Sequence, residues 1–353
     1  MSENRHERPG VYSAYDASTV VSAGRGSKIV GVAAKAARGT VGEVVTVTGY
    51  AAGVAAFGED AAPGMSTILK LLFLNGAAQV EAVRVADAGA ATDYEEAFAA
   101  LGKREAQILV CDSSALEVQQ ALRGAVEEAS GQRKERIAVV GGSGESAAEL
   151  VTRAAALNSE RMVLVGPDAL SSDGVALSGV FAAAAVAGVL SDSRDPAVPL
   201  NGAELKGLGG LSEEYSDNDI DLLVRGGVTP LESVAGMISP VRGITTRTTT
   251  GGAVDTTWRE LTTILIVDDI IPAVRASLRS KFARTKNTVR TRSAIRSQVI
   301  VELEKKLAAE IIDSYGDVSV TADADDPTVC LVEFGFTVAH GLNQIYLTVH
   351  ITV

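Results

Sequence analysis

The sequence predicts an α/β protein with a doubly wound, mainly parallel sheet in a large domain, followed by a smaller α+β domain. The first observation is an alternation of apolar strands with amphipathic helices through the middle of the 353 residues. The second is composition: 46% of the residues are hydrophobic but only 4% are aromatic, which favours closely packed layers over a disordered chain. The third is a change to a Thr- and Gly-rich sequence near residue 245. We therefore expect an extended N-terminal arm (1–20), an α/β domain (21–250) and an α+β domain (251–353).

The N-terminal arm is expected to be extended because Pro9-Gly10 breaks the chain and the residues after it are rich in β-forming side chains. The large sheet begins after this arm. The elements expected here are, in order, a strand at 28–34, a strand at 44–49, a helix at 66–75 that stops at Asn75-Gly76, and a strand at 79–86.

A regular strand–helix alternation follows, and it is the main support for a parallel sheet. Strands are expected at 106–112, 136–142 and 161–167, with a Ser-capped helix at 114–130 and a second helix at 146–158. An apolar run at 174–190 comes next. It is short for a membrane span, Ala and Gly dominate it, and Asp173 and Asp192 flank it closely, so it predicts a buried, tightly packed helix.

The C-terminal part has a different order of elements. A Gly-broken segment at 245–257 predicts a linker or hairpin and marks the domain boundary. A helix is expected from about Pro272, and a long helix from about 288 to 314, in which apolar residues recur every four positions. That apolar stripe consists of Ile295, Val299, Leu303, Leu307 and Ile311.

Two alternating strands are expected to complete the small domain, and the last of them is the clearest strand signal in the chain. The stretch LNQIYLTVHITV (342–353) alternates apolar and polar side chains and is rich in β-branched residues. We expect this strand to lie on the sheet of the small domain. An edge strand carries a row of unpaired backbone groups, which invites pairing with another chain.

Charge and cysteine content exclude some classes of protein. The formal net charge of −12 argues against a general nucleic-acid-binding protein, which usually needs a basic face. Cys111 and Cys330 lie far apart, each in an apolar run, and predict buried free thiols in a reducing compartment. The polar, charged residues 1–10 predict no secretory signal.

The best candidate for an anion-binding loop is GGSGES (141–146), which joins a predicted strand to a predicted helix. It lacks the Lys of a Walker loop and the spacing of dinucleotide-binding glycines. Glu145 also stands where a nucleophile elbow needs its second Gly. We favour a tight turn between strand and helix, and the alternative is a soluble α/β nucleotide-binding enzyme that uses the Gly141–Ser146 loop.

Other signs of chemistry are weak. The three histidines are His6, His340 and His350. None has a carboxylate or second histidine at a metal-binding spacing, and no triad pattern is present. The acidic pairs Asp268-Asp269 and Asp325-Asp326 are expected at solvated turns. We therefore predict no catalytic residue, no metal site, no cofactor and no enzyme activity.

One charged segment stands out, because eight basic residues and no acidic one lie between Asp269 and Glu302. These residues are Arg275, Arg279, Lys281, Arg284, Lys286, Arg290, Arg292 and Arg296. They form either a solvated helix face or a surface that complements an acidic partner, including another copy of this chain. The residues expected in such a contact are Arg275, Arg279, Lys281 and Arg284.

Several stretches, taken in order, resemble the contractile tail sheath proteins of bacteriophages and related phage-tail-like particles. RPGVYSAYDAS (8–18) is similar to the Pro-Gly-Val-Tyr arm of that family. Residues 30–60 resemble its early strand–turn–strand unit, and residues 72–87 resemble the helix–Asn-Gly–strand unit that follows. Weaker similarities lie at 180–190, 223–232 and 241–248, and in the order of elements in the final domain. Together they cover most of a chain that looks like a compact sheath subunit.

The resemblance implies that the α/β domain is the outer domain, that the α+β domain is the inner one, and that both chain ends are exchanged between subunits. Each end would add a strand to the sheet of a neighbour. The pairing residues implied are Val11, Tyr12, Ala14 and Tyr15 in the arm and Ile345, Leu347, Val349 and Ile351 in the terminal strand.

The resemblance also implies a helical homopolymer of six-fold rings around a rigid tail tube. Its contraction, which needs no nucleotide, would drive the tube through a target cell envelope. The partners implied are other copies, the tail tube protein, and baseplate and terminator proteins, with no nucleic acid and no membrane insertion. The location implied is a virion tail or an extracellular phage-tail-like particle, assembled in the bacterial cytoplasm. The basic residues named above are then candidates for contacts with the tube or with neighbours.

Overall fold

The computed structural model describes residues 28–349. The predicted arm, with Val11, Tyr12, Ala14 and Tyr15, lies outside the described residues, and so does Ile351.

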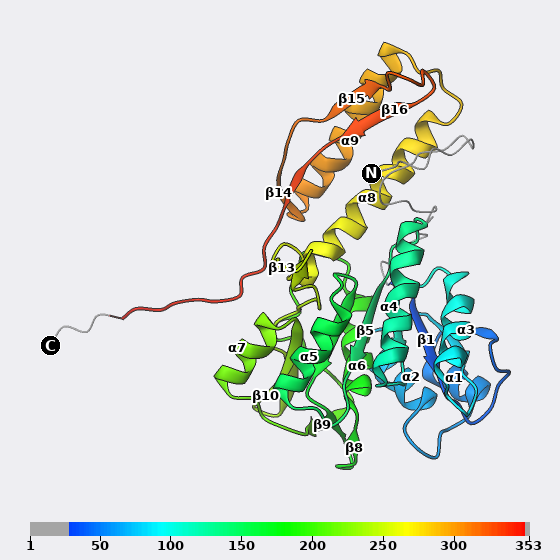
Figure 1. The fold of residues 1–353 in the computed structure, drawn as a ribbon, viewed down its shortest axis with the longest axis vertical. Helices are drawn as coiled ribbons and strands as arrows, with labels where there is room; N and C mark the ends of the chain where they lie inside the picture. Colours follow the sequence, from blue (N-terminus) through cyan, green and yellow to red (C-terminus); the bar gives the residue numbers. More distant parts are fainter. Residues whose placement is uncertain (1–27, 350–353) are drawn as a thin grey trace.

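The large domain is built on an eight-stranded sheet in the order β11-β10-β6-β5-β4-β1-β3-β2 (Figure 1). The strands are β1 Val30–Ala34, β2 Val44–Val47, β3 Val80–Arg84, β4 Ile108–Cys111, β5 Ile137–Gly141, β6 Met162–Gly166, β10 Val228–Val234 and β11 Met237–Pro240. All neighbours from β10 to β3 pair in parallel, whereas the edge strands β11 and β2 are antiparallel to theirs. The prediction of a mainly parallel sheet is confirmed.

Helices cover both faces of this sheet, which makes it doubly wound. One face carries α1 Tyr50–Phe57, α2 Met65–Leu74 and α6 Gly179–Asp192, and the other carries α3 Ala91–Gly102, α4 Leu116–Gly131, α5 Ala147–Leu157 and α7 Asp217–Arg225. Side chains alternate between the two cores along each strand, so that Val32 packs on one face and Ala33 on the other. Helices α1, α3 and α7 were not predicted, and α1 and α7 are short, at 8 and 9 residues. The Ser cap predicted for α4 is wrong, because its N-cap residue is Ala115.

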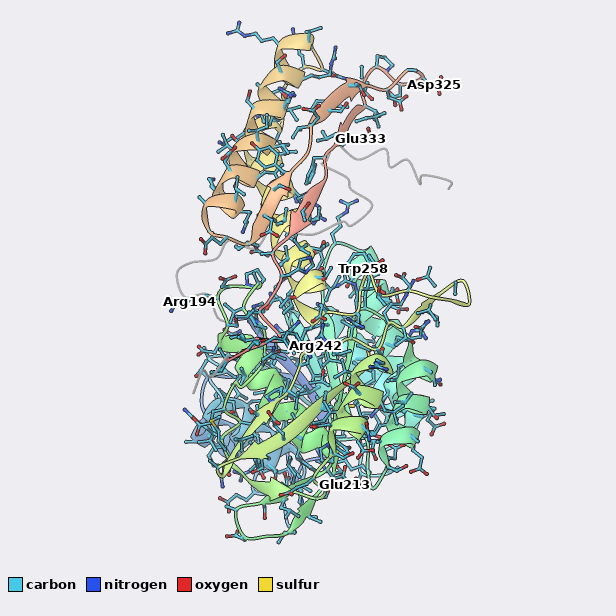
Figure 2. All side chains as sticks on the ribbon, turned by 90° about the vertical axis from the view of Figure 1, so that its left-hand side faces the viewer. Arg194, Glu213, Arg242, Trp258, Asp325 and Glu333 are labelled. Atoms are coloured by element: carbon cyan, nitrogen blue, oxygen red, sulfur yellow. The ribbon has the colours of Figure 1, made fainter. Side chains whose placement is uncertain are left out.

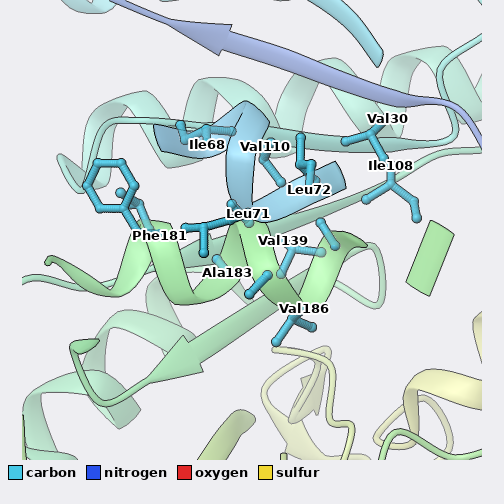
Figure 3. Close-up of a cluster of buried hydrophobic side chains, with 14 of the residues drawn as sticks. Val30, Ile68, Leu71, Leu72, Ile108, Val110, Val139, Phe181, Ala183 and Val186 are labelled. Atoms are coloured by element: carbon cyan, nitrogen blue, oxygen red, sulfur yellow. The ribbon is translucent and has the colours of Figure 1, made fainter. Parts of the chain in front are cut away.

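Helix α6 is the buried helix predicted from the Ala-rich run, and it packs against α2 (Figure 3). Its small side chains allow a close approach: a Cβ at Gly188 would lie 2.7 Å from Asn75 Cβ and 2.9 Å from the Leu72 carbonyl oxygen. Within residues 28–349, no helix combines the length and apolar character needed to cross a membrane.

Two smaller β units complete the large domain. They are the sheet of β7 Ala169–Ser171, β8 Ala176–Leu177 and β9 Leu208–Leu211, and the hairpin of β12 Thr249–Thr250 and β13 Ala253–Val254. The hairpin is held to the large domain because Asn158 Oδ1 accepts hydrogen bonds from the backbone N–H groups of Thr248 and Thr249, both at 3.1 Å. The predicted boundary at residue 250 falls inside this hairpin, and the exact domain limits stay a prediction.

The small domain packs two helices against short strands. Its elements are α8 Leu261–Phe282, α9 Val289–Ala308, β14 Ile312–Tyr315, β15 Ser319–Ala322, β16 Cys330–Glu333 and β17 Phe336–Val338. Helix α8 connects the domains: Leu261 and Ile264 belong to the core of the large domain, whereas Ile270 and Val274 belong to the core of the small one (Figure 1).

Three predictions for this domain are wrong. Helix α8 begins at Leu261 rather than near Pro272, because Pro272 removes a single helical hydrogen bond while the apolar side chains around it are buried. Helix α9 ends at Ala308, not near 314, because Glu310 adopts a left-handed φ of 56°. Ile311 still enters the core, from beyond the helix end. Cys330 is only partly buried, at the first residue of β16.

Candidate intersubunit site

Doubly wound sheets usually bind ligands at the carboxyl ends of the strands, where the strand order reverses. Here that point lies between β1 and β4, and the protein's own side chains fill it. The buried Tyr94 hydroxyl donates to Asp112 Oδ1 at 2.6 Å, and the Lys35 backbone N–H donates to Asp112 Oδ2 at 2.9 Å. Burial raises the pKa of Asp112, and the hydrogen bond from Tyr94 opposes that rise. This polar cluster connects β4 to α3 and to the end of β1.

The GGSGES loop is closed in the same way. The Gly144 N–H donates to Asp168 Oδ2 at 2.7 Å, and the Ser146 N–H donates to Glu149 Oε2 at 2.9 Å. Two of the backbone N–H groups that could hold an anion in this loop are therefore bound to carboxylates of the same chain. This geometry supports the tight-turn interpretation and gives the nucleotide-binding alternative no support. In the described part of the chain, no group of three or more His, Cys, Asp or Glu side chains is placed to hold a metal ion.

The pair Asp268-Asp269 is not a solvated turn, so that prediction is wrong. Both residues lie inside α8. Asp268 accepts two hydrogen bonds from the Arg161 guanidinium, at 2.9 and 3.0 Å, and Asp269 pairs with Lys306 of α9. Burial raises the pKa of Asp268 to about 6, against the opposing effect of Arg161. Asp268 thus holds α8 to the large domain, and Asp269 holds it to α9.

Arg275 was predicted as a surface contact residue, and its position contradicts that prediction. Its side chain is only 4% exposed and pairs with Glu135, itself 6% exposed, at an Nη2–Oε1 distance of 3.0 Å. Burial lowers the pKa of Arg275 to about 10, and the carboxylate of Glu135 opposes this effect. Arg275 therefore stabilises the junction between the two domains and is not available to a partner.

The other predicted basic residues do lie at the surface. Arg279, Lys281 and Arg284 are exposed at the end of α8, and Lys281 also donates to Gln298. Lys286 and Arg290 are exposed beside them. We call these five residues the basic end. An acidic turn lies next to it, because Asn287 Nδ2 donates to the carbonyl oxygens of Pro327 and Val329, just after Asp325 (Figure 2).

The strands of the small domain form one long, two-stranded antiparallel ribbon, which is interrupted between its two pairs of strands. Strands β14 and β17 pair, β15 and β16 pair, and the Gly316 N–H donates to the Gly335 carbonyl oxygen at 2.9 Å between the two pairs. One face packs Val320, Val332 and Phe336 against the helices. Each strand has a single strand partner within residues 28–349, so both long edges of the ribbon are unpaired. Unpaired edges accept further strands, and a two-stranded ribbon alone is marginally stable.

The segment after β17 is extended and belongs to no sheet. We call residues 341–349 the tail, and it projects away from both domains (Figure 1). Ile345 is 80% exposed, Leu347 86% and Val349 68%. The expectation that the terminal strand lies on the sheet of its own domain is therefore wrong for the described residues. An open ribbon and an unpaired apolar tail occur together in one subunit, and this was not apparent from local sequence patterns.

Sequence comparison identifies the class of protein to which this fold belongs. The family model for the central domain of phage tail sheath proteins matches residues 88–246, and the model for their C-terminal domain matches residues 253–352. A tail sheath protein of Bacillus phage SP01 is 30% identical over 249 residues, which are 69% of this chain and 42% of that protein. The chain thus spans less than half the length of this curated relative. These matches place it among the structural proteins of phage tails.

Within that class, the chain belongs to the phage tail sheath family. Solved structures show the same fold. The anti-feeding prophage helical sheath in its contracted state has a TM-score of 0.73 at 16% identity, covering 98% of this chain and 99% of that chain. A sheath tail protein from Desulfitobacterium hafniense has a TM-score of 0.70 at 12% identity, covering 93% and 100%. The sheath of the PVC extracellular contractile injection system, also contracted, has a TM-score of 0.72 at 15% identity and covers 99% of both chains.

Proposed function

We propose that this chain is the structural subunit of a contractile tail sheath, which polymerises helically around a rigid tail tube by intersubunit β-strand exchange. Contraction of the sheath drives the tube through a target cell envelope. One observation carries the proposal: the subunit has a two-stranded ribbon whose edges are unpaired, and an unpaired tail in which apolar and polar residues alternate. Each supplies the backbone hydrogen bonds that the other lacks.

The geometry of such an exchange explains why the product is a polymer. The tail of one copy pairs with the ribbon of another, so donor and acceptor are different surfaces. A contact of this kind leaves a free donor and a free acceptor after each addition, and it generates stacked rings or helices. The residues proposed for pairing are those of the arm (Val11, Tyr12, Ala14 and Tyr15) and of the tail and its continuation (Ile345, Leu347, Val349 and Ile351).

The energy for contraction comes from contacts between subunits, with no nucleotide and no enzyme activity. The sheath assembles in an extended, metastable state and then shortens and widens as subunit faces reach a packing of lower free energy. Solved relatives include an anti-feeding prophage baseplate structure as well as helical sheaths. This supports other copies and a baseplate as partners here, and we further propose six-fold rings, the tail tube and a terminator. We place the subunit in a virion tail or an extracellular phage-tail-like particle assembled in the bacterial cytoplasm.

Electron microscopy of the purified full-length chain tests the proposal. We expect tubes or stacked rings at high protein concentration, because each subunit offers both a donor tail and an acceptor ribbon. A small, monodisperse oligomer at every concentration, with binding of a nucleotide, would contradict the proposal.

The basic end is proposed as a contact for the tail tube or for an acidic face of a neighbour. Replacing Arg279 and Arg284 with Glu should weaken assembly on a tube, and the defect should change with salt because exposed charges are screened within about 10 Å at 0.1 M ionic strength. Assembly is measured by electron microscopy and sedimentation across salt concentrations. The matched control replaces the exposed Lys70 and Lys103 of the large domain with Glu, which changes the net charge equally. Normal assembly of the Arg279/Arg284 variant at low salt would assign these residues to a solvated face.

A further inference from the structure

The tail leaves the subunit through a contact with the large domain. Gly341 lies against Pro199: a Cβ added to Gly341 would be 3.0 Å from both Cβ and Cγ of that proline. Two residues further, Asn201 Nδ2 donates to Asn343 Oδ1 at 2.8 Å. The backbone of Gly341 lies outside the left-handed region, so the chain runs on without a turn. After this contact every described tail residue is exposed.

A different course is open to the same sequence. Strand β17 ends at Val338, and a two-residue turn at His340-Gly341 would return the tail along the free edge of the ribbon, because Gly suits such turns. In an antiparallel pairing, Leu342 would then face Ala339, and each step along the tail would match one step back along the ribbon.

This folded-back pairing would be favourable in its side chains. It places Ile345 opposite Phe336, Leu347 opposite Phe334 and Val349 opposite Val332. Those ribbon residues all pack toward the core of the small domain. Directly opposite residues in an antiparallel pair share a face, so the apolar side chains of the tail would be buried with them. A tail captured in this way could not be donated to another copy.

We propose that Pro199 and Asn201 guide the tail, holding Gly341 and Asn343 in an extended course that prevents the tail from pairing with its own ribbon. This inference rests on the proposed strand exchange and assigns these four residues a positioning role in it. The large domain thereby directs the tail of the small domain toward a neighbouring subunit.

A disulfide trap can measure self-capture. The pairing described above brings residue 351 opposite Cys330, so the variant Ile351→Cys can form an intrachain disulfide only when the tail folds back far enough. The other native thiol, Cys111, is buried, and burial raises its pKa to about 12, which keeps it unreactive. The full-length variant is oxidised at a concentration below that of assembly. The intrachain product is quantified by mobility on a non-reducing gel and by mass spectrometry.

The test adds Asn201→Ala, which removes the side chain that donates to Asn343 Oδ1 and leaves no acceptor for the Asn343 amide. We expect the intrachain product to increase by about two- to tenfold, the ratio that corresponds to the loss of one net hydrogen bond. Tube yield from the Asn201→Ala chain should fall in parallel. The control is Asn218→Ala, the same substitution at an exposed position on α7, and it should match the parent.

Equal intrachain cross-linking in the parent and in the Asn201→Ala variant would overturn the proposal that Pro199 and Asn201 guide the tail. Failure of strand exchange itself would give a different result. The parent chain would then form no tubes, or a chain without residues 345–353 would form tubes as well as the parent does. The ratio of intrachain cross-linking between the Asn201 variant and the parent still tests the guiding role of Pro199 and Asn201 in that case, because it is measured within single chains.

Discussion

A chain that lacks residues 345–353 is expected to stay folded and to form no tubes. The described part of this segment is exposed and has no strand partner, so its removal leaves the cores of both domains intact. The loss falls on the proposed intersubunit pairing, which would consist of main-chain hydrogen bonds and alternating side-chain contacts. Circular dichroism should give an unchanged melting temperature, and electron microscopy at high protein concentration should show no polymers.

A series of substitutions in the same assay separates the effect of the length of the tail from the effect of its alternating apolar side chains. Replacing Ile345, Leu347 and Val349 with Ser keeps the tail length but removes its apolar face, and it should abolish tubes as the deletion does. The matched control replaces Gln344, Tyr346 and Thr348 with Ser and should retain assembly. Normal tubes from the deleted chain would refute strand exchange through the tail.

Replacing Arg275 with Met is expected to lower the free energy of unfolding by about 3–5 kcal/mol, the cost of leaving a buried carboxylate without its partner. Glu135 is 6% exposed and accepts from Arg275 at 3.0 Å, so its charge has little access to water once the guanidinium is removed. The measurement is chemical denaturation followed by circular dichroism.

Two further variants test this explanation. Arg279→Met, one helical turn further along α8, removes an exposed charge and should change stability by less than about 0.5 kcal/mol. The double variant Glu135→Gln with Arg275→Met should recover part of the loss, because the uncompensated charge is removed with its partner. A loss below about 1 kcal/mol for Arg275→Met alone would mean that water reaches Glu135 in the folded protein.

The large domain was predictable because its signals are local. A buried apolar run followed by an amphipathic helix identifies a strand–helix unit, as for β5 and α5, and small side chains identify a helix that must pack closely, as for α6. Helix ends were less predictable. The apolar spacing of α9 continues to Ile311, although a left-handed Glu310 has already ended the helix.

The partners of charged residues could not be predicted, because the contacts that decide them are distant in sequence. Asp268 pairs with Arg161, 107 positions away, and Arg275 pairs with Glu135, 140 positions away. A single sequence shows only that Asp268 has an acidic neighbour and that Arg275 lies in a basic run. These patterns suggest exposed residues. The contact of the tail with Asn201 could not be predicted either, because Asn201 lies in a different domain, 142 positions from Asn343.

The adjacent carboxylates of α8 have a mechanical consequence. Successive residues of an α-helix point about 100° apart around the helix axis. Asp268 and Asp269 are adjacent along α8, yet Asp268 faces the large domain and Asp269 faces α9. Arg161 restrains one side chain and Lys306 the other. Turning α8 about its axis in either direction would strain both ion pairs at once. The two ion pairs therefore tie the rotation of α8 to Arg161 of the large domain and to α9 of the small domain at adjacent residues.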